Sequence, residues 1–202
     1  MGTGSPSDVA GMVLELASSR PATLGTGRLI CVDGPAGSGK TTLGAALAER
    51  TGAQLIHADD LMEGWRGLDA VGRQLAGLVA ALDAGRPGSY RHFDWQRHRY
   101  DRTVPVPPAP WLVVEGVGSG AAAIASYLTV LVWIEVDDEV RLARGMARDG
   151  EQMRDHWLTF MADERALFAR DGIRERADVL VDGTGARPPV VVSRPRRRRP
   201  GP

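Results

Sequence analysis

One short stretch of the sequence has the residue types and spacing of a phosphate-binding loop. Residues 34–41 read Gly-Pro-Ala-Gly-Ser-Gly-Lys-Thr, which satisfies the pattern G-x-x-x-x-G-K-[ST]. Glycines let successive backbone N–H groups turn toward one phosphate, and a helix that begins there adds its positive dipole end. In this pattern Lys40 reaches the β- and γ-phosphates, and the Thr41 hydroxyl is a ligand for Mg²⁺. The stretch therefore predicts a site for ATP and magnesium.

The context of the loop supports this interpretation. The apolar run 28–33 precedes it and a helical pattern at 40–51 follows it, as expected for a strand, a loop and a helix. Lys40 is the only lysine among 25 basic residues, which indicates a position that needs a compact ammonium rather than the planar fork of arginine. We expect the nucleotide to contact Gly34, Ala36, Gly37, Ser38, Gly39, Lys40, Thr41 and Thr42.

Carboxylates follow two other predicted strands. Asp59 and Asp60 come after the run 53–57, and Glu115 ends the run 111–115. In an open parallel sheet, ligands bind outside the carboxyl ends of the strands, so these acids are expected beside the loop. There Asp59 can accept the proton of an attacking hydroxyl, and Glu115 can hold Mg²⁺ directly or through water. The sequence leaves open whether Asp59 or Asp60 is the base, and exposed loop acids are the alternative.

Arginines recur on one predicted helix farther along the chain. Arg141, Arg144 and Arg148 stand at i, i+3 and i+7, so they share a helical face. Such a face can close over a triphosphate and stabilise the charge of the transition state. We predict Arg144 and Arg148 as catalytic residues in a lid at about 138–155. A solvated arginine face is the alternative in a chain this rich in arginine.

The segment 90–99 mixes aromatic rings, histidines and charges. It reads Tyr-Arg-His-Phe-Asp-Trp-Gln-Arg-His-Arg. Its rings can stack on a ligand, and its polar groups can hydrogen-bond a substrate. A surface loop with aromatic rings packed into the domain is the alternative. With the neighbouring acid, the residues predicted for an acceptor pocket are Asp60, Phe93, Asp94 and His98.

The elements that must position these residues alternate between strands and helices. Apolar runs predict strands at 28–33, 53–57, 111–115, 128–136 and 177–181. Helical patterns lie at 8–19, 40–51, 68–84, 138–148 and 152–170. Continuous apolar runs are typical of a parallel sheet with helices on both faces. We predict an α/β fold, a three-layer P-loop NTPase sandwich with about five parallel strands, a small helical lid and a long excursion at 85–110.

Length and composition limit the class of protein. The 202 residues are 43% hydrophobic, which is enough for one core, and we assign 1–193 to a single domain. A membrane span is not expected, because no run of 18 apolar residues is present. The single cysteine excludes an internal disulfide, and the first 20 residues do not have the pattern of a secretory signal. These features predict a cytoplasmic protein.

The zero net charge hides an uneven distribution. Five arginines lie among the last nine residues, so the rest of the chain carries about −5. We predict 194–202 as a basic disordered tail. Nucleic acid is not expected as a partner of a chain with no net charge, and this tail is the single hint of one.

Several of these landmarks occur in the order known from one family. The chain resembles the uridine kinase-like branch of small P-loop kinases, which includes phosphoribulokinase-like enzymes. The resemblance lies in the loop 34–41, His57-Ala-Asp-Asp-Leu61, Phe93-Asp-Trp-Gln-Arg-His98, Val113-Val-Glu-Gly116 and the lid helix 141–149. It implies transfer of the γ-phosphate of Mg·ATP to a hydroxyl of a small molecule, with a nucleoside as the acceptor. It also implies Asp59 as the general base, with Phe93 and His98 in the acceptor pocket.

Three other functions stay open. Residues 33–37 are also similar to the loop of cytidylate kinases, which makes a nucleoside monophosphate the first alternative acceptor. A non-nucleoside metabolite is the second, and a module that binds ATP without transferring phosphate is the third. A GTPase switch is not expected, because the guanine-reading element Asn-Lys-x-Asp needs a lysine other than Lys40.

Overall fold

The apolar runs of the sequence form a six-stranded sheet. The computed structural model describes residues 4–192, so the tail predicted at 194–202 lies outside the described part. The strand order is β2-β5-β1-β6-β7-β8, and the first five strands are parallel. The strands are β1 Arg28–Asp33, β2 Gln54–His57, β5 Trp111–Glu115, β6 Val130–Glu135, β7 Val179–Asp182 and β8 Val190–Val191. The predicted parallel sheet is confirmed, and the short β8 adds an antiparallel edge.

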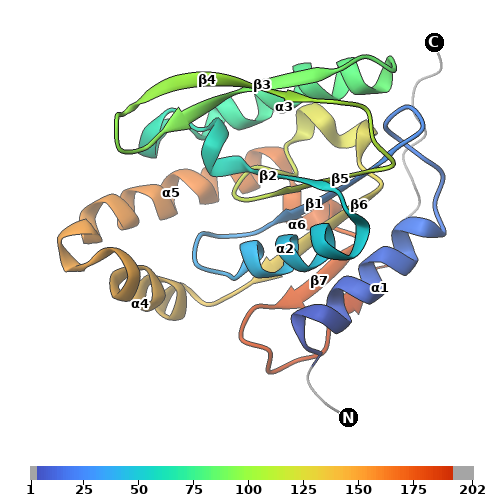
Figure 1. The fold of residues 1–202 in the computed structure, drawn as a ribbon. Helices are drawn as coiled ribbons and strands as arrows, with labels where there is room; N and C mark the ends of the chain where they lie inside the picture. Colours follow the sequence, from blue (N-terminus) through green and yellow to red (C-terminus); the bar gives the residue numbers. More distant parts are fainter. Residues whose placement is uncertain (1–3, 193–202) are drawn as a thin grey trace.

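Helices cover both faces of this sheet, which gives the three predicted layers (Figure 1). Helices α1 (Pro6–Ser18) and α2 (Lys40–Thr51) pack together on one face. On the other face lie α3 Leu68–Asp83, α5 Arg154–Asp171 and the short α6 Ile173–Arg176. Helix α1 begins two residues before the predicted start because Ser5 and Asp8 form a capping box around its first turn.

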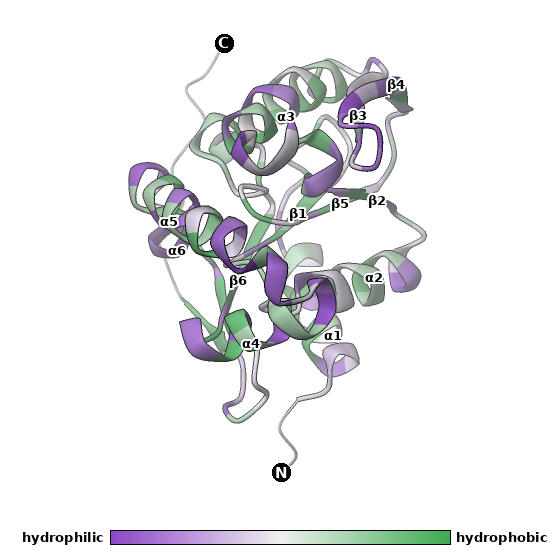
Figure 2. Ribbon diagram, turned by 90° about the vertical axis from the view of Figure 1, so that its left-hand side faces the viewer, coloured by the Kyte–Doolittle hydropathy of each residue, from purple (hydrophilic) through white to green (hydrophobic). Residues whose placement is uncertain are grey.

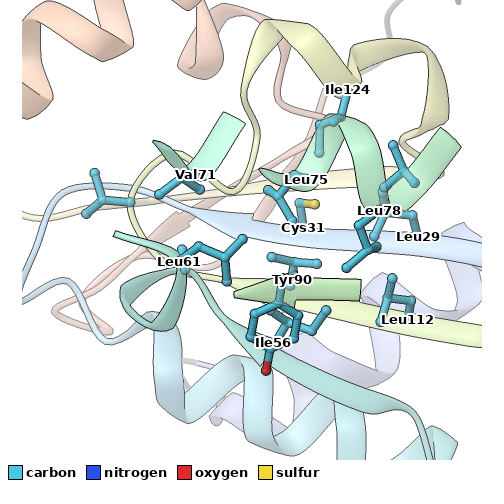
Figure 3. Packing of buried hydrophobic residues seen from close by; sticks show 14 of the residues in the cluster. Leu29, Cys31, Ile56, Leu61, Val71, Leu75, Leu78, Tyr90, Leu112 and Ile124 are labelled. Atoms are coloured by element: carbon cyan, nitrogen blue, oxygen red, sulfur yellow. The ribbon is translucent and has the colours of Figure 1, made fainter. Parts of the chain in front are cut away.

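Each face of the sheet has its own apolar core. Figure 3 shows Leu75 and Leu78 of α3 packed over Cys31 and Leu29 of β1. Alternate residues of the same strands point to the other face, where they meet α1 and α2. Figure 2 shows the hydrophobic colouring along the strands and hydrophilic colouring at the hairpin turn. Burying one such leucine stabilises the fold by about 1.5–3 kcal/mol, so the cores fix the positions of the strand ends.

The predicted long excursion folds as a β-hairpin. Strands β3 (Gly88–Asp94) and β4 (Arg99–Val106) pair antiparallel and form a second, two-stranded sheet. The hairpin packs against α3 and against the 3₁₀ turn Ala58–Leu61 that follows β2. It therefore lies beside the strand end that carries the two candidate aspartates (Figure 1).

The predicted lid region forms a helical arm at the end of the sheet (Figure 1). It consists of α4 (Asp138–Asp149), a 3₁₀ turn (Glu151–Met153) and the first turns of α5. A small cluster of Met146, Trp157 and Met161 holds the arm together. Within residues 4–192, none of the helices is both long and apolar enough to span a bilayer.

Candidate active site

The glycine loop joins β1 to α2 and wraps around the start of that helix. Gly34 has a φ of 143°, and a Cβ there would lie 2.3 Å from the carbonyl oxygen of Ile134, so the loop can start only with glycine. The ammonium of Lys40 is buried and donates to the carbonyl oxygen of Pro35 at 2.9 Å. The Ser38 hydroxyl is buried and has no hydrogen-bond partner among the described residues.

These features of the loop fit an anionic ligand. A buried hydroxyl without a partner costs free energy, and a phosphate oxygen beside Ser38 would remove that cost. Lys40 is positioned by its bond to the loop, and Thr42 is exposed in the first turn of α2. Ser38 and Lys40 therefore offer polar groups that fit a phosphate.

A buried aspartate holds the beginning of the loop. The Asp33 carboxylate accepts hydrogen bonds from the backbone N–H groups of Gly34, Gly118 and Gly120 at 2.7, 3.1 and 2.7 Å. Burial raises the pKa of Asp33 to about 6, against the lowering effect of these three donors and of Lys40. Asp33 links the loop to the segment after β5, and sequence reasoning did not single it out.

A buried ion pair braces the middle of the loop. Glu164 of α5 accepts the backbone N–H of Ala36 at 2.9 Å and pairs with Arg141 of α4. Arg141 also bonds the Asp138 carboxylate at 2.7–2.8 Å. Burial raises the pKa of Glu164. Arg141 thus differs from Arg144 and Arg148 on the predicted arginine face, because it is buried behind the loop and they are exposed.

The ends of α2, β2 and β5 bring together oxygen ligands suited to magnesium. The Thr41 hydroxyl donates to Oε1 of Glu115 at 3.2 Å, and His57 Nδ1 lies 2.6 Å from the same oxygen. Glu115 is only 4% exposed, so its carboxylate is held in place by these contacts. The described residues hold no group of three or more His, Cys, Asp or Glu side chains arranged for a metal. Mg²⁺ usually takes one or two protein oxygens, with water and phosphate completing its shell, so Thr41 and Glu115 fit it.

The strand ends open onto a cleft of about 710 Å³. Asp59 is exposed there, and no hydrogen bond to its carboxylate is found within residues 4–192. Asp60 is half-buried, and burial raises its pKa. The cleft brings together nine of the predicted site residues, which are Ala36, Gly37, Gly39, Lys40, Thr41, Asp59, Asp60, Glu115 and Arg148.

The two predicted lid arginines contact different parts of the site. Arg144 donates to the carbonyl oxygens of Gly37 and Gly183 at 3.1 and 3.2 Å, so it bridges the loop to the segment after β7. Arg148 lines the cleft and makes two hydrogen bonds to Asp149 at 2.7 and 2.9 Å. Because both guanidinium groups are exposed at the rim, either can turn toward a triphosphate.

The residues predicted from the hairpin lie outside the cleft lining. Phe93 is buried with its ring 5.6 Å from that of Trp95, and Asp94 accepts the N–H groups of Gln96 and Arg97 at the turn. His98 is exposed in that turn with a φ of 51°. Asp94 and His98 therefore belong to the hairpin turn. Phe93 packs against Trp95, which is the residue of this segment that lines the cleft.

Sequence reasoning missed the aromatic residues that do line the cleft. Trp65, Trp95 and Trp157 face it, together with Phe160. Three of the five tryptophans of the chain therefore meet at one place. Trp95 is adjacent to the predicted Asp94, whereas the other rings come from a 3₁₀ turn and a lid helix that no local motif connects to the loop.

Comparison with known proteins supports the architecture. No family model and no curated protein matches the chain. A protein from Silicibacter sp. TM1040 described provisionally as a fructose transport system kinase is 20% identical, with a TM-score of 0.59 over 82% of this chain and 95% of that one. A Bacillus stearothermophilus protein described provisionally as a uridine kinase is 18% identical, with a TM-score of 0.58 over 87% and 100%.

The YGR205w protein is 9% identical, with a TM-score of 0.57 over 94% of this chain and 100% of that one. At these identities the likeness shows the fold alone. The chain shares the α/β fold of these three structures, and the predicted resemblance to uridine kinase-like proteins is confirmed at the level of the fold.

Proposed function

We propose that the protein is a kinase that transfers the γ-phosphate of Mg·ATP to a hydroxyl group of a small molecule. One observation carries the proposal: the phosphate loop, the Thr41–Glu115 oxygen pair and the exposed Asp59 line the same cleft. Phosphoryl transfer needs groups for the phosphates, for magnesium and for the acceptor proton close together, and this grouping supports the proposal. A module that only binds ATP would not need the third of these.

In this proposal the residues of the cleft have separate roles in phosphoryl transfer. Bound ATP would supply the phosphoryl group, and the magnesium ion would neutralise part of the negative charge on the phosphates. Asp59 takes the proton of the acceptor hydroxyl as that oxygen bonds the γ-phosphorus, and ADP retains the electrons of the broken phosphorus–oxygen bond. Lys40, Arg144 and Arg148 stabilise the charge that moves onto the leaving oxygen. Thr41 and Glu115 hold the magnesium.

For the acceptor we propose a nucleoside, on the resemblance of 57–61 and 113–116 to uridine kinase-like enzymes. The two neighbours described as kinases differ in their descriptions, one as a fructose transport system kinase and the other as a uridine kinase. A nucleoside monophosphate or another metabolite would use the same loop and the same base.

The test is ADP release from Mg·ATP by the purified protein with nucleosides, nucleoside monophosphates and sugars as separate additions. We expect ADP release that depends on one acceptor, and a loss of at least 100-fold in Lys40→Ala with its fold intact by circular dichroism. ATP binding without acceptor-dependent ADP from any addition would contradict the proposal and favour a binding module.

A further inference from the structure

One wall of the cleft is made of aromatic rings. Trp65 is at its centre, with ring centroids 5.8 Å from Trp95, 6.4 Å from Trp157 and 5.6 Å from Phe160. The rings meet edge to face, so Trp157 and Phe160 are buried while Trp65 and Trp95 stay half-exposed to the cleft. His156 stacks on Trp65 with ring centroids 5.9 Å apart. Trp95 and the uncovered part of Trp65 therefore offer the flat apolar surface to a ligand.

The charges beside these rings are mostly negative. The cleft is lined by Asp59, Asp60, Glu115 and Asp149, but only by two cations, Lys40 and Arg148. Lys40 bonds within the phosphate loop, and Arg148 makes two bonds to Asp149. Among the described residues that line the cleft, four carboxylates therefore outnumber two cations, and both cations are assigned to the triphosphate of ATP. A phosphorylated acceptor would meet like charge there.

The hairpin fixes the two aspartates in different ways. Trp95 Nε1 donates to the backbone carbonyl of Asp59 at 3.1 Å, which leaves the carboxylate of that residue free. His92 bonds Asp101 through Nδ1 at 2.8 Å and points Nε2 toward the Asp60 carboxylate at 3.7 Å. His92 thus positions the Asp60 carboxylate. That carboxylate can accept a hydrogen bond from a second hydroxyl of the acceptor while Asp59 acts as base.

We propose that Asp60, Trp65 and Trp95 form an acceptor subsite for an uncharged polyhydroxyl compound with one flat apolar face, and that the subsite excludes phosphorylated acceptors. His92 is a positioning residue for Asp60. This inference rests on the proposed kinase function, and it limits the acceptor to compounds without a phosphate group. Sugars and nucleosides share the required chemistry, because both combine hydroxyl groups with a face that stacks on an indole.

The first experiment compares matched acceptor pairs: uridine with uridine 5′-monophosphate, and fructose with fructose 6-phosphate. Binding is followed by tryptophan fluorescence, and transfer by ADP release. We expect the uncharged member of one pair to bind at least 10-fold tighter than its phosphate ester, and the identity of that pair separates a nucleoside from a sugar. Asp60→Asn should reduce this preference.

The outcomes separate the subsite from the kinase function. Tighter binding and faster ADP release with a phosphate ester would leave the kinase standing and overturn the subsite. Binding of an uncharged acceptor without ADP release would support the subsite and contradict the kinase. If neither member of either pair binds while ATP does, the subsite is overturned.

Variants then test the individual groups. Trp95→Leu removes the flat face and the bond to Asp59, whereas Trp95→Phe keeps a flat face. We expect KM for the acceptor to rise 10-fold or more in the leucine variant and less in the phenylalanine variant, with KM for ATP unchanged. Trp111→Leu, outside the cleft, is the control for loss of a tryptophan. Equal KM values in all three variants would exclude stacking.

For His92 the informative readout is the division between KM and kcat. His92→Leu should raise the acceptor KM and leave KM for ATP unchanged, and His92→Gln should recover part of the loss because its polar amide can still lie beside the Asp60 carboxylate. A merely structural role predicts a lowered melting temperature and equal effects of both variants, which would overturn the positioning role.

Discussion

At the scale of single residues, the position of Asp59 makes it the expected base. Its carboxylate is exposed in the cleft, and it makes no hydrogen bond to any residue between 4 and 192, whereas Asp60 faces His92. Asp59→Asn keeps the shape of the side chain but removes its ability to take a proton, so we expect kcat to fall about 10²- to 10⁴-fold. ATP affinity should be unchanged.

Asp69→Asn is a suitable control for that variant. It makes the same chemical change on the exposed surface of α3, where Asp69 pairs with Arg170, and turnover should not change. If Asp59→Asn has nearly the turnover of the wild type, the base is Asp60 instead. Steady-state ADP release at saturating acceptor decides between the two.

Asp33 predicts a pH dependence of stability. Its pKa is about 6 in the folded protein against 3.8 for an ordinary aspartate, so between these values the folded state binds more protons than the unfolded chain. The free energy of unfolding must therefore decrease as the pH rises from 3.8 to 6. The difference of about 2 pKa units corresponds to about 3 kcal/mol.

The comparison with Asp33→Asn isolates this contribution from that of other carboxylates. Urea unfolding at pH 4 and pH 7 should show the wild type losing about 3 kcal/mol relative to the variant over that interval. A constant difference between the two proteins would mean that the three backbone donors keep Asp33 ionised at both pH values.

At the scale of elements, a glycine inside α2 sets the distance between that helix and β5. A Cβ on Gly44 would lie 2.8 Å from Cγ of Glu115, the side chain that meets Thr41. Gly44→Ala should therefore displace Glu115 and raise the Mg²⁺ concentration needed for half-maximal activity, despite the better helix propensity of alanine.

Gly77→Ala is the matched control in α3, because a Cβ at Gly77 meets nothing within 4 Å. That variant should gain up to about 1 kcal/mol of stability with no change in the magnesium requirement. If both alanine variants have the magnesium dependence of the wild type, close approach at Gly44 is not needed for the metal.

The pair of Glu164 and Arg141 connects α5 and α4 to the phosphate loop. Glu164→Ala leaves a buried guanidinium with only the Asp138 carboxylate as a partner and removes the acceptor for the Ala36 N–H. Breaking a buried pair in this way costs about 3–5 kcal/mol. Urea unfolding measures the loss, and Glu175→Ala on the exposed side of α6 is the control.

The double variant Arg141→Met, Glu164→Leu removes both charges together. It should be more stable than Glu164→Ala, because no uncompensated charge is left in the core. A double variant as unstable as the single one would indicate that the bond to Ala36, rather than the ion pair, stabilises the arm.

At the scale of the whole molecule, the elements that could be predicted from the sequence are those with a local pattern of apolar residues. The five parallel strands and the helix 40–51 follow from apolar runs and a glycine loop, and both were predicted within a few residues. The hairpin was not predicted, because the turn between β3 and β4 lacks an Asn-Gly or Asp-Gly pair and β4 contains Pro105. Strand β8 has only two residues, too few for a pattern.

The residues of the candidate site likewise fall into those that could be predicted from the sequence and those that could not. Residues that follow a strand, such as Asp59 and Glu115, could be placed in the cleft because parallel strands end at one edge. Trp65, Trp157 and His92 could not, since tertiary packing of the lid and the hairpin brings them there. The predicted roles of Phe93, Asp94 and His98 depended on the hairpin geometry, which no local signal specified.

The phosphate loop contacts several parts of the domain, so ATP bound there should stabilise the whole fold. The loop is connected to β1 through Asp33, to α5 through Glu164 and to the segment after β7 through Arg144. A ligand that binds only the folded protein adds about 2.7 kcal/mol at 100 times its Kd. For a domain of this size, that corresponds to about 5–10 °C in Tm.

Thermal unfolding with and without Mg·ATP measures this shift. Lys40→Ala should lose most of it, because the ammonium that meets the phosphates is gone, whereas Asp59→Asn should keep it, because a base for the acceptor hydroxyl contributes nothing to ATP binding. The two variants therefore separate binding from transfer in one assay. A full shift in Lys40→Ala would place the nucleotide outside the phosphate loop and contradict the assignment of the cleft.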